Sequence, residues 1–287
     1  MIQEIAPHIY HNEYRPTAPS AEDYVMICRK GELFLREKEG QISYLTVQET
    51  EAACPGSTEQ LIYLFQVDER HFFLLKNADQ KLTSLFTEFA FCGLRMLRQA
   101  RPKHLAFAGV TAYQLFRWYE NHKFCGHCGR PMKQDAKERM MFCESCGLQE
   151  FPKICPAVIV GIRNGDKILM SKYEGREHKH YALIAGFAEI GETIEETVHR
   201  EVMEEVGLKV KNLTFYRSQP WSFSDTLLMG FYCDLDGDDR ITLDRTELAV
   251  AEWKSREEIE GVDEDLSLTG EMMLRFKRGL DREPYLK

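Results

Sequence analysis

The sequence predicts a mixed α/β (α+β) protein in three parts. Short β-rich segments are followed by helical patterns in both halves of the chain. Two CxxC pairs lie between these halves, and in the C-terminal half a strand-like segment leads through a glycine-bounded loop into an acidic helix. We therefore expect an N-terminal α+β domain at residues 1–120, a zinc ribbon at 121–155 and a second α/β domain at 156–287.

The acidic helix has signals at both ends. Thr193 followed by Glu196 has the spacing of a capping box, and Gly207 suits the left-handed residue that ends a helix. An apolar stripe at four-residue spacing predicts the face that packs on a core. The stripe consists of Ile194, Val198, Val202 and Val206.

Three carboxylates share the other face of this helix. Glu201, Glu204 and Glu205 are spaced at i, i+3 and i+4. Like charges at this spacing destabilise a helix by roughly 0.2–0.5 kcal/mol per pair, so a cation is expected to offset them. Divalent ions such as Mg²⁺ take oxygen ligands of this kind, whereas the alternative is a solvated acidic face.

Residues 186–208 resemble the Nudix box, Gly-x5-Glu-x7-Arg-Glu-U-x-Glu-Glu-x-Gly-U, where U is aliphatic. Every fixed position is filled, by Gly186, Glu192, Arg200, Glu201, Val202, Glu204, Glu205, Gly207 and Leu208. The resemblance implies an αβα sandwich with a mixed sheet. It also implies hydrolysis of a nucleoside diphosphate linked to another group.

The composition restricts the class of protein to which the chain can belong. The 287 residues suffice for two domains, and 44% are hydrophobic. No run approaches the roughly 20 apolar residues that span a bilayer, and the first residues lack the apolar core of a signal peptide. The net charge of −9 argues against nucleic-acid binding by a basic surface. We expect a cytoplasmic protein without membrane contact.

The N-terminal domain shows no catalytic constellation. Strands are expected at residues 24–29, 33–36, 42–47, 61–67 and 72–75. The spacing of Leu85, Phe89, Cys92 and Met96 predicts a helix, and a second helix is expected over residues 104–120.

The two CxxC pairs predict a structural zinc site. Two such knuckles bring four thiolates into the tetrahedron that Zn²⁺ prefers, and four sulfur ligands leave no position for a catalytic water. A disulfide pair or a thiol redox motif is the alternative. The four residues are Cys125, Cys128, Cys143 and Cys146.

The C-terminal domain is predicted to contain a mixed sheet. Asn164-Gly165 is a hairpin turn signal between strands at 157–163 and 167–171. Further strands are expected at 181–185, 213–219, 227–235 and 248–253. Ser255 with Glu258 has capping-box spacing, and a last helix is expected around residues 272–280.

A second signature narrows the resemblance. Residues 218–226, SQPWSFSDT, resemble the SQPWPFPxS signature of the NADH pyrophosphatases, and the zinc ribbon precedes the box as in that family. Ser222 and Ser224 replace family prolines, Thr226 replaces a serine, and Phe151-Pro152 stands where Tyr-Pro is common. The chain is identified as a member of this family, which cleaves NADH or NAD⁺ to nicotinamide mononucleotide and AMP.

The resemblance also implies the site residues. Glu201, Glu204 and Glu205 bind Mg²⁺ or Mn²⁺, and Glu205 or Glu204 polarises the attacking water. Glu247 and the Ala185 carbonyl are implied as further metal ligands, and Glu192 with Arg200 as a pair that braces the loop. The implied substrate contacts are Phe187, Gln219, Trp221 and Phe151. In the family, the position of Phe151 is contributed by a partner chain, which implies a homodimer.

Three alternatives stay open at this point. The first is another substrate of the same enzyme class: ADP-ribose, FAD or a dinucleoside polyphosphate. Removal of an NAD cap from RNA 5′ ends is the same cleavage on a larger substrate, and a local basic patch would help it (Arg130, Lys133, Lys137, Arg139). The third is a non-catalytic nucleotide-binding zinc-ribbon module, against which the intact acids argue.

Overall fold

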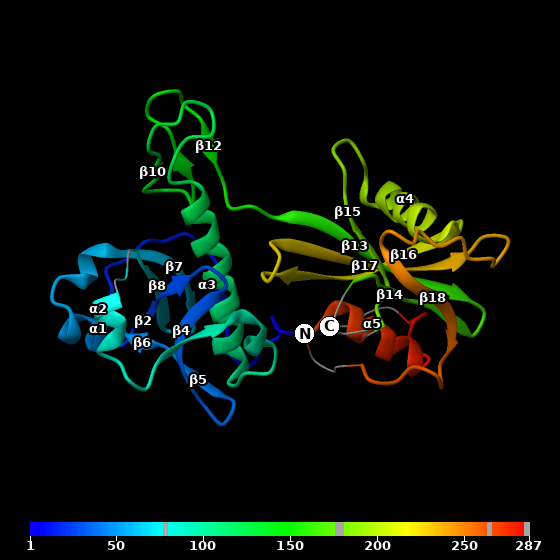
Figure 1. Ribbon diagram of the computed structural model, residues 1–287, viewed down its shortest axis with the longest axis horizontal. Coiled ribbons are helices and arrows are strands. Elements are labelled where there is room, and N and C mark those ends of the chain that lie inside the picture. The colour runs from blue at the N-terminus through cyan, green and yellow to red at the C-terminus, as the bar shows by residue number, and fades with distance from the viewer. Residues whose placement is uncertain (77, 79, 176–180, 263–265, 284–287) are drawn as a thin grey trace. The chain divides into compact units, whose positions relative to one another are not determined.

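A computed structural model describes residues 1–76, 78, 80–175, 181–262 and 266–283. The chain forms two compact units. One contains residues 154–221 and 225–287 with Met1, and the other contains residues 2–153 with 222–224. Figure 1 labels the elements of both units.

The unit that begins at residue 154 is built on a six-stranded mixed sheet. The strand order is β16-β17-β13-β14-β18, and β15 pairs with β13. Only β13 and β17 run parallel among the pairs described. The strands are β13 (Cys155–Asn164), β14 (Lys167–Tyr173), β15 (Ile184–Phe187), β16 (Val210–Trp221), β17 (Thr226–Leu235) and β18 (Leu248–Ser255). The predicted hairpin at Asn164-Gly165 is confirmed, since Asn164 pairs with Lys167.

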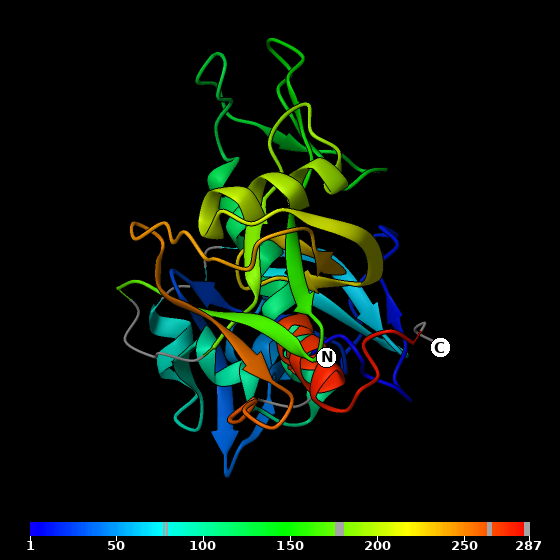
Figure 2. The ribbon, with the colours of Figure 1, turned by 90° about the vertical axis from the view of Figure 1, so that its right-hand side faces the viewer.

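Two helices cover opposite faces of this sheet. Helix α4 (Ile194–Val206) lies on one face and α5 (Leu268–Lys277) on the other (Figures 1 and 2). Each helix closes a separate apolar core, and a fully buried valine or leucine contributes about 1.5–3 kcal/mol to such a core. The α4 side includes Val198, Val202, Val206, Ile184 and Leu169; the α5 side includes Leu268, Met272, Phe276, Ile168 and Met170. The predicted αβα sandwich is confirmed.

Helix α4 begins and ends where the sequence predicts. The Thr193 hydroxyl accepts the Glu196 N–H at 3.2 Å, and the Glu196 carboxylate accepts the Thr193 N–H at 2.8 Å. Gly207 closes the helix in the left-handed conformation, with φ 67°. This fixed start sets the rotation of the helix, and therefore the direction of its acidic face.

The other unit contains one long helix and, ahead of the zinc ribbon, two small sheets. One sheet has the order β1-β7-β8-β2-β6, and the other joins β3, β4, β5 and β9. The strands are β1 (Tyr10–His11), β2 (Tyr24–Met26), β3 (Cys28–Arg29), β4 (Glu32–Lys38), β5 (Gln41–Ser43), β6 (Leu45–Thr46), β7 (Leu61–Val67), β8 (Arg70–Leu75) and β9 (Ala90–Gly93). The helices are α1 (Val47–Ala53), α2 (Gln80–Ser84) and α3 (Lys103–Asn121). Helix α3 confirms the helix expected at residues 104–120.

Two local predictions are wrong. The helix expected through Leu85, Phe89, Cys92 and Met96 is replaced by strand β9 and a 3₁₀ turn at Leu94–Arg98. Strand β9 pairs with β4, and Phe89 and Phe91 both lie against Phe34, so tertiary pairing outweighs the local periodicity. Ser255 and Glu258 form half of the predicted capping box, a 2.8 Å hydrogen bond, yet no helix follows within residues 256–262.

The helices of the described residues include no candidate membrane span, because none combines sufficient length with sufficient apolar character.

Candidate active site and metal centre

The three predicted acids of α4 lie in different environments. Glu205 is 2% exposed and Glu201 is also buried, whereas the side chain of Glu204 is largely exposed. Helix α4 contacts β15, and the Glu201 carboxylate lies against Gly186 of that strand. Two carboxylates are therefore held in the interior next to a third in solvent.

Glu201 occupies a space that only glycine leaves open. A Cβ built on Gly186 of β15 would lie 1.9 Å from the Glu201 carboxyl carbon and 2.1 Å from each of its oxygens. The carboxylate thus lies directly against the strand backbone, next to Ala185. The φ of Gly186 is not in the left-handed region, so its backbone conformation does not require glycine. The close contact with the Glu201 carboxylate therefore explains the glycine at this position of the Nudix box.

Arg200 connects the acids of the helix to the preceding loop. Its guanidinium donates to Glu192 at 2.5 and 3.0 Å and to the Phe187 carbonyl at 2.8 Å. It also donates to Glu201 at 2.8 Å and to Glu204 at 2.9 Å. The predicted Glu192–Arg200 brace forms. The two further contacts were not predicted, because they depend on how far the side chain reaches along the helix.

Glu192 is the permanent anion of this group. The Arg200 guanidinium lowers the pKa of Glu192 to about 2, and the Glu189 N–H at 3.0 Å contributes to the same shift. The Thr197 hydroxyl donates a further hydrogen bond at 3.0 Å. The loop between β15 and α4 is therefore closed by a charged, fully hydrogen-bonded pair.

Glu205 has the opposite character. Burial raises its pKa to about 8, and the charges of Glu201, Glu247 and Asp244 add to the rise. Neither carboxylate oxygen has a hydrogen-bond partner in the described part of the chain. The backbone N–H of Ala185 faces this carboxylate and offsets part of the rise without completing a hydrogen bond.

Unpaired buried carboxylate oxygens are costly unless a cation takes them. The orphaned oxygens of Glu205, the carboxylate of Glu201 against Gly186 and the all-oxygen donor set fit a hard divalent metal. Burial also raises the pKa of Glu201, so a nearby positive charge would favour its ionised form.

Glu247 reaches this region through a loop that the sequence did not predict. The Asp244 N–H donates to the Glu205 carbonyl at 2.9 Å, and the Glu247 N–H donates to Asp244 at 3.3 Å. The Glu247 carbonyl in turn accepts the Glu174 N–H at 2.9 Å. These bonds tie residues 244–247 to the end of α4, which brings the Glu247 charge to Glu201 and Glu205.

The acids do not close into a tight cage. Among the described residues, only the four cysteines place ligand atoms within 4.8 Å of one another. Arg200 holds Glu201 and Glu204 by direct hydrogen bonds, so a metal would compete with this guanidinium for the same oxygens.

The predicted substrate residues differ in their exposure to solvent. Phe187 is 53% exposed and Phe151 is 52% exposed, so both rings are accessible. Gln219 is fully buried: it donates to the Leu266 carbonyl at 3.1 Å and accepts the Leu268 N–H at 2.7 Å. Trp221 ends β16, opposite Thr226 of β17, so the signature is strand and hairpin rather than loop.

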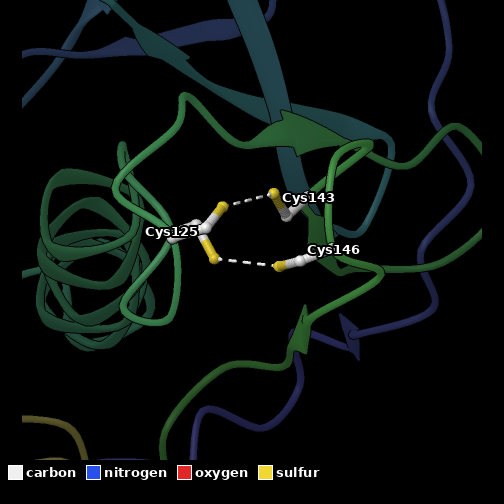
Figure 3. Close-up of side chains that lie close together, drawn as sticks. Cys125, Cys143 and Cys146 are labelled. Carbon is white, nitrogen blue, oxygen red and sulfur yellow. Dashed lines mark hydrogen bonds between the residues drawn. The ribbon is translucent and has the colours of Figure 1, made fainter.

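The zinc ribbon has the geometry of a thiolate site. Its small sheet consists of β10 (Lys133–Gln134), β11 (Met141–Phe142) and β12 (Gln149–Glu150). Cys125 and Cys146 have their sulfurs 3.4 Å apart, and Cys128 and Cys143 have theirs 3.5 Å apart (Figure 3). These separations approach the edge of a tetrahedron with metal–sulfur bonds of about 2.3 Å.

The two knuckles repeat one backbone pattern. The Gly129 N–H donates to the Cys125 carbonyl and the Gly147 N–H donates to the Cys143 carbonyl, both at 2.9 Å. Both glycines have a positive φ. Backbone N–H groups of Cys146 and Ser145 lower the pKa of Cys143 to about 7, which favours the thiolate. The nine cysteines are free thiols, so the disulfide alternative does not describe this site.

Two of the four residues of the basic patch suggested for the ribbon have partners in the structure. Arg139 donates to the Leu64 carbonyl at 2.5 Å and to the Asn12 carbonyl at 3.1 Å. Lys133 pairs with Glu144 at 2.8 Å. These two contacts hold Arg139 and Lys133 within the ribbon and its N-terminal unit, whereas Arg130 and Lys137 are exposed.

Comparison with protein families agrees with this geometry. The NUDIX domain model matches residues 153–274, which contain the six-stranded sheet and α4. The NADH pyrophosphatase zinc ribbon domain matches residues 120–151. A NADH pyrophosphatase-like rudimentary NUDIX domain matches residues 22–118, a relationship that the sequence reasoning missed because no fixed motif marks it. The fold and the acid-bearing helix thus define a Nudix protein.

The three consecutive matches further specify the class. The chain belongs to the zinc-ribbon-containing NADH pyrophosphatase family of Nudix hydrolases. It is 43% identical over 161 residues to the NAD-capped RNA hydrolase NudC of Klebsiella pneumoniae (strain 342), covering 56% of this chain and 62% of that protein. It is 44% identical over 149 residues to the protein of the same name from Salmonella schwarzengrund, covering 52% and 56%. The chain thus spans about three-fifths of the length of these curated relatives.

A NUDIX hydrolase from Nitrosomonas europaea is 19% identical with a TM-score of 0.49, and the similarity covers 57% of this chain and 96% of that one.

Proposed function

We propose that this protein hydrolyses the pyrophosphate bond of NADH or NAD⁺ to nicotinamide mononucleotide and AMP, with Mg²⁺ or Mn²⁺ as cofactor. We propose the same cleavage for the NAD cap of RNA 5′ ends. The observation that carries the proposal is the buried Glu205 carboxylate, which has no hydrogen-bond partner in the described chain and lies beside Glu201 and the loop of Glu247. The names of the curated relatives support the choice of substrate.

The roles of the acids follow from their environments. Glu201, Glu204, Glu205, Glu247 and the Ala185 carbonyl would hold the metal, which would offset charge on the phosphoryl oxygens and lower the pKa of a water. Glu205 or Glu204 accepts the proton of the attacking water. Because Glu205 is buried and lacks a partner, its proton affinity favours that role.

Other residues of the chain bind and position the dinucleotide. We propose that Phe187 and Phe151 stack on a base or on the nicotinamide ring, since both are accessible. Trp221 adds an apolar contact. Gln219 contributes to the substrate site through the backbone it holds, because its amide bonds fix the start of α5. Arg200 holds the loop that carries Phe187.

We further propose a cytoplasmic homodimer with the domain limits 1–120, 121–155 and 156–287. The exposed rings of Phe151 and Phe187 and the exposed Ile190 support a partner chain at the site. One structural zinc per chain follows from the four cysteines. Light scattering of the purified protein tests the dimer, and a monomer at micromolar concentration would contradict it.

A second substrate class is favoured by one feature. Ser222 and Ser224 stand where the family signature has prolines, which removes two restrictions on φ next to Trp221. ADP-ribose, FAD or a dinucleoside polyphosphate would then be preferred substrates.

A product analysis separates these cases. The purified protein is incubated with NADH, NAD⁺, an NAD-capped oligonucleotide, ADP-ribose, FAD and a dinucleoside polyphosphate, in Mg²⁺ and in Mn²⁺. We expect AMP and nicotinamide mononucleotide from NADH at the highest kcat/KM. Preferential turnover of another compound would replace NADH as the substrate, and no turnover of any compound would contradict a catalytic function.

A further inference from the structure

Two lysines, a tyrosine and a glutamate meet on the sheet of the Nudix domain, apart from the acids of α4. The Lys172 ammonium lies 4.0 Å from the centroid of the Tyr181 ring, and the Lys254 ammonium lies 5.4 Å from the same centroid. The Tyr181 hydroxyl donates to Glu252, and Lys254 pairs with Glu252 at 3.2 Å. These four residues are called the lysine–tyrosine cluster below.

The lysine–tyrosine cluster holds two cations against one carboxylate. The side chain of Lys254 is only 19% exposed, so its charge is partly removed from water. Glu258 also acts on Lys254, but its carboxylate accepts the Ser255 N–H at 2.8 Å. Two ammonium groups beside one ring repel each other, and an anion from outside would offset this repulsion.

The residues that lead into β15 relate the cluster to the candidate active site. Tyr181, Leu183 and Ala185 pack in the core beneath α5, whereas Ile184 packs in the core beneath α4. Side chains of an extended segment alternate between faces, so Phe187 is the next member of the Tyr181 series. Tyr181 and the exposed Phe187 ring therefore lie on one face of the sheet.

The lysines lie on this same face. Ile168 and Met170 of β14 belong to the core beneath α5, and Lys172 follows them at the next alternate position. Residues directly opposite each other on paired strands point to the same face. Lys254 pairs with Ile168 and Glu252 pairs with Met170, so both share the face of Lys172.

The separation along the chain indicates which part of a substrate would reach the cluster. Tyr181 precedes Ala185 by four residues, which is about 13 Å of extended backbone at about 3.3 Å per residue. An anion at the cluster is therefore a different group from the pyrophosphate at Ala185.

We propose that Lys172, Lys254 and Tyr181 form a binding site for a phosphate group of the substrate other than the cleaved pyrophosphate. This inference rests on the proposed function. Two substrates of the proposed class carry such a group: the phosphodiesters of NAD-capped RNA and the 2′-phosphate of NADPH. Lysine ammonium groups bind either one as point charges, without a fixed geometry.

Kinetics with three substrates test the site. NADH lacks the additional phosphate, whereas NADPH and an NAD-capped oligonucleotide of about ten nucleotides carry it. In Lys172→Ala and Lys254→Ala we expect KM for at least one of NADPH and the oligonucleotide to rise about three- to fivefold per lysine, which corresponds to the loss of one ion pair at the protein surface. We expect kcat and KM for NADH to stay unchanged. Lys211→Ala is the matched control, because Lys211 lies on β16 at the opposite edge of the sheet, paired with Asp236.

Direct binding makes the test independent of turnover. In a Glu205→Gln background, affinity for NADPH is measured by calorimetry and affinity for the labelled capped oligonucleotide by fluorescence anisotropy. Weaker binding of the oligonucleotide identifies RNA phosphates as the ligand, provided that the slope of log K against log salt concentration becomes shallower by about 0.7 per lysine. Weaker binding of NADPH alone identifies the 2′-phosphate.

Two negative results have different meanings. Unchanged binding of both ligands in the lysine variants overturns the phosphate site, even if the wild type cleaves NADH. Failure of the wild type to cleave NADH overturns the proposed function, and the binding data still decide whether the lysines hold a phosphate. Lys254→Arg keeps the charge, and affinity retained in this variant excludes a packing defect as the cause.

Discussion

The Cα atom of Gly186 lies so close to the Glu201 carboxylate that a Cβ there would be 1.9 Å from the carboxyl carbon. The strand and the helix can therefore keep their positions only while residue 186 has no side chain. This relationship joins β15, which carries the Ala185 carbonyl, to α4, which carries the acids.

Replacing Gly186 by alanine should displace Glu201. Because a misplacement of about 1 Å can cost about 100-fold in rate, we expect kcat for NADH to fall by about that factor while the fold is retained. Steady-state kinetics and circular dichroism measure the two effects. Gly93→Ala is the control, since a Cβ there meets nothing within 4 Å. Wild-type kinetics in Gly186→Ala would show that the carboxylate position is unimportant.

Arg200→Lys keeps the charge but loses the planar fork. Arg200 contacts Glu192, Glu201, Glu204 and the Phe187 carbonyl, and a lysine cannot make these contacts together. Mutation of residues that orient metal ligands typically weakens metal affinity by about 10–100-fold. We therefore expect the Mn²⁺ concentration for half-maximal activity to rise by a factor of about 10–100. Arg245→Lys serves as the exposed control. An unchanged Mn²⁺ titration would contradict an orienting role.

Gln219→Leu should destabilise the start of α5. It leaves the Leu268 N–H and the Leu266 carbonyl without their buried partner, at a cost of about 1–3 kcal/mol in the free energy of unfolding. Chemical denaturation measures this loss, and Ser218→Ala on the exposed side of the same strand is the comparison. If Gln219→Leu matched Ser218→Ala in stability but raised KM, the amide would act on the substrate directly.

The N-terminal unit should lose stability in mild acid. The rings of His8 and His104 lie 3.7 Å apart, and burial together with the His8 charge lowers the pKa of His104 below its ordinary 6.5, an effect that Asp68 partly offsets. The unfolded chain then binds more protons near pH 6, so stability is complete above about pH 6.5 and falls as the pH decreases. The pKa of Asp68 is also lowered, chiefly by its hydrogen bond with His8, and adds a loss of the same sign at lower pH.

Thermal unfolding at pH 7.5 and 5.5 checks this prediction. His104→Phe removes the titrating ring, and its Tm should fall less than that of the wild type between the two values. Equal falls in both proteins would mean that other groups cause the acid sensitivity.

The sequence predicted the arrangement of side chains where that arrangement depends on fixed spacing along the chain. Glu201, Glu204 and Glu205 share a helix face because of the helical period, and Thr193 and Gly207 fix where that helix begins and ends. The four cysteines were predicted for the same reason. In each case the partners lie within a few residues or in a repeated knuckle.

What the sequence did not reveal depends on contacts between distant segments. Arg200 reaches three acids, Asp244 ties its loop to α4, and Gln219 turns inward to the start of α5. Strand β9 was mistaken for a helix because its pairing with β4 has no local signal. The exposure of Glu204 beside the burial of Glu205 likewise follows from packing alone.

The most direct test of the proposed function is the activity of Glu205→Gln, which keeps the shape of the side chain but removes its negative charge. NADH is incubated with Mn²⁺ and equal amounts of wild type or variant, and AMP is quantified by chromatography. We predict AMP formation by the wild type and a loss of at least about 100-fold in the variant, in the range of a lost general base. AMP formation by the variant at the wild-type rate would contradict the assignment of this buried carboxylate to metal binding and catalysis.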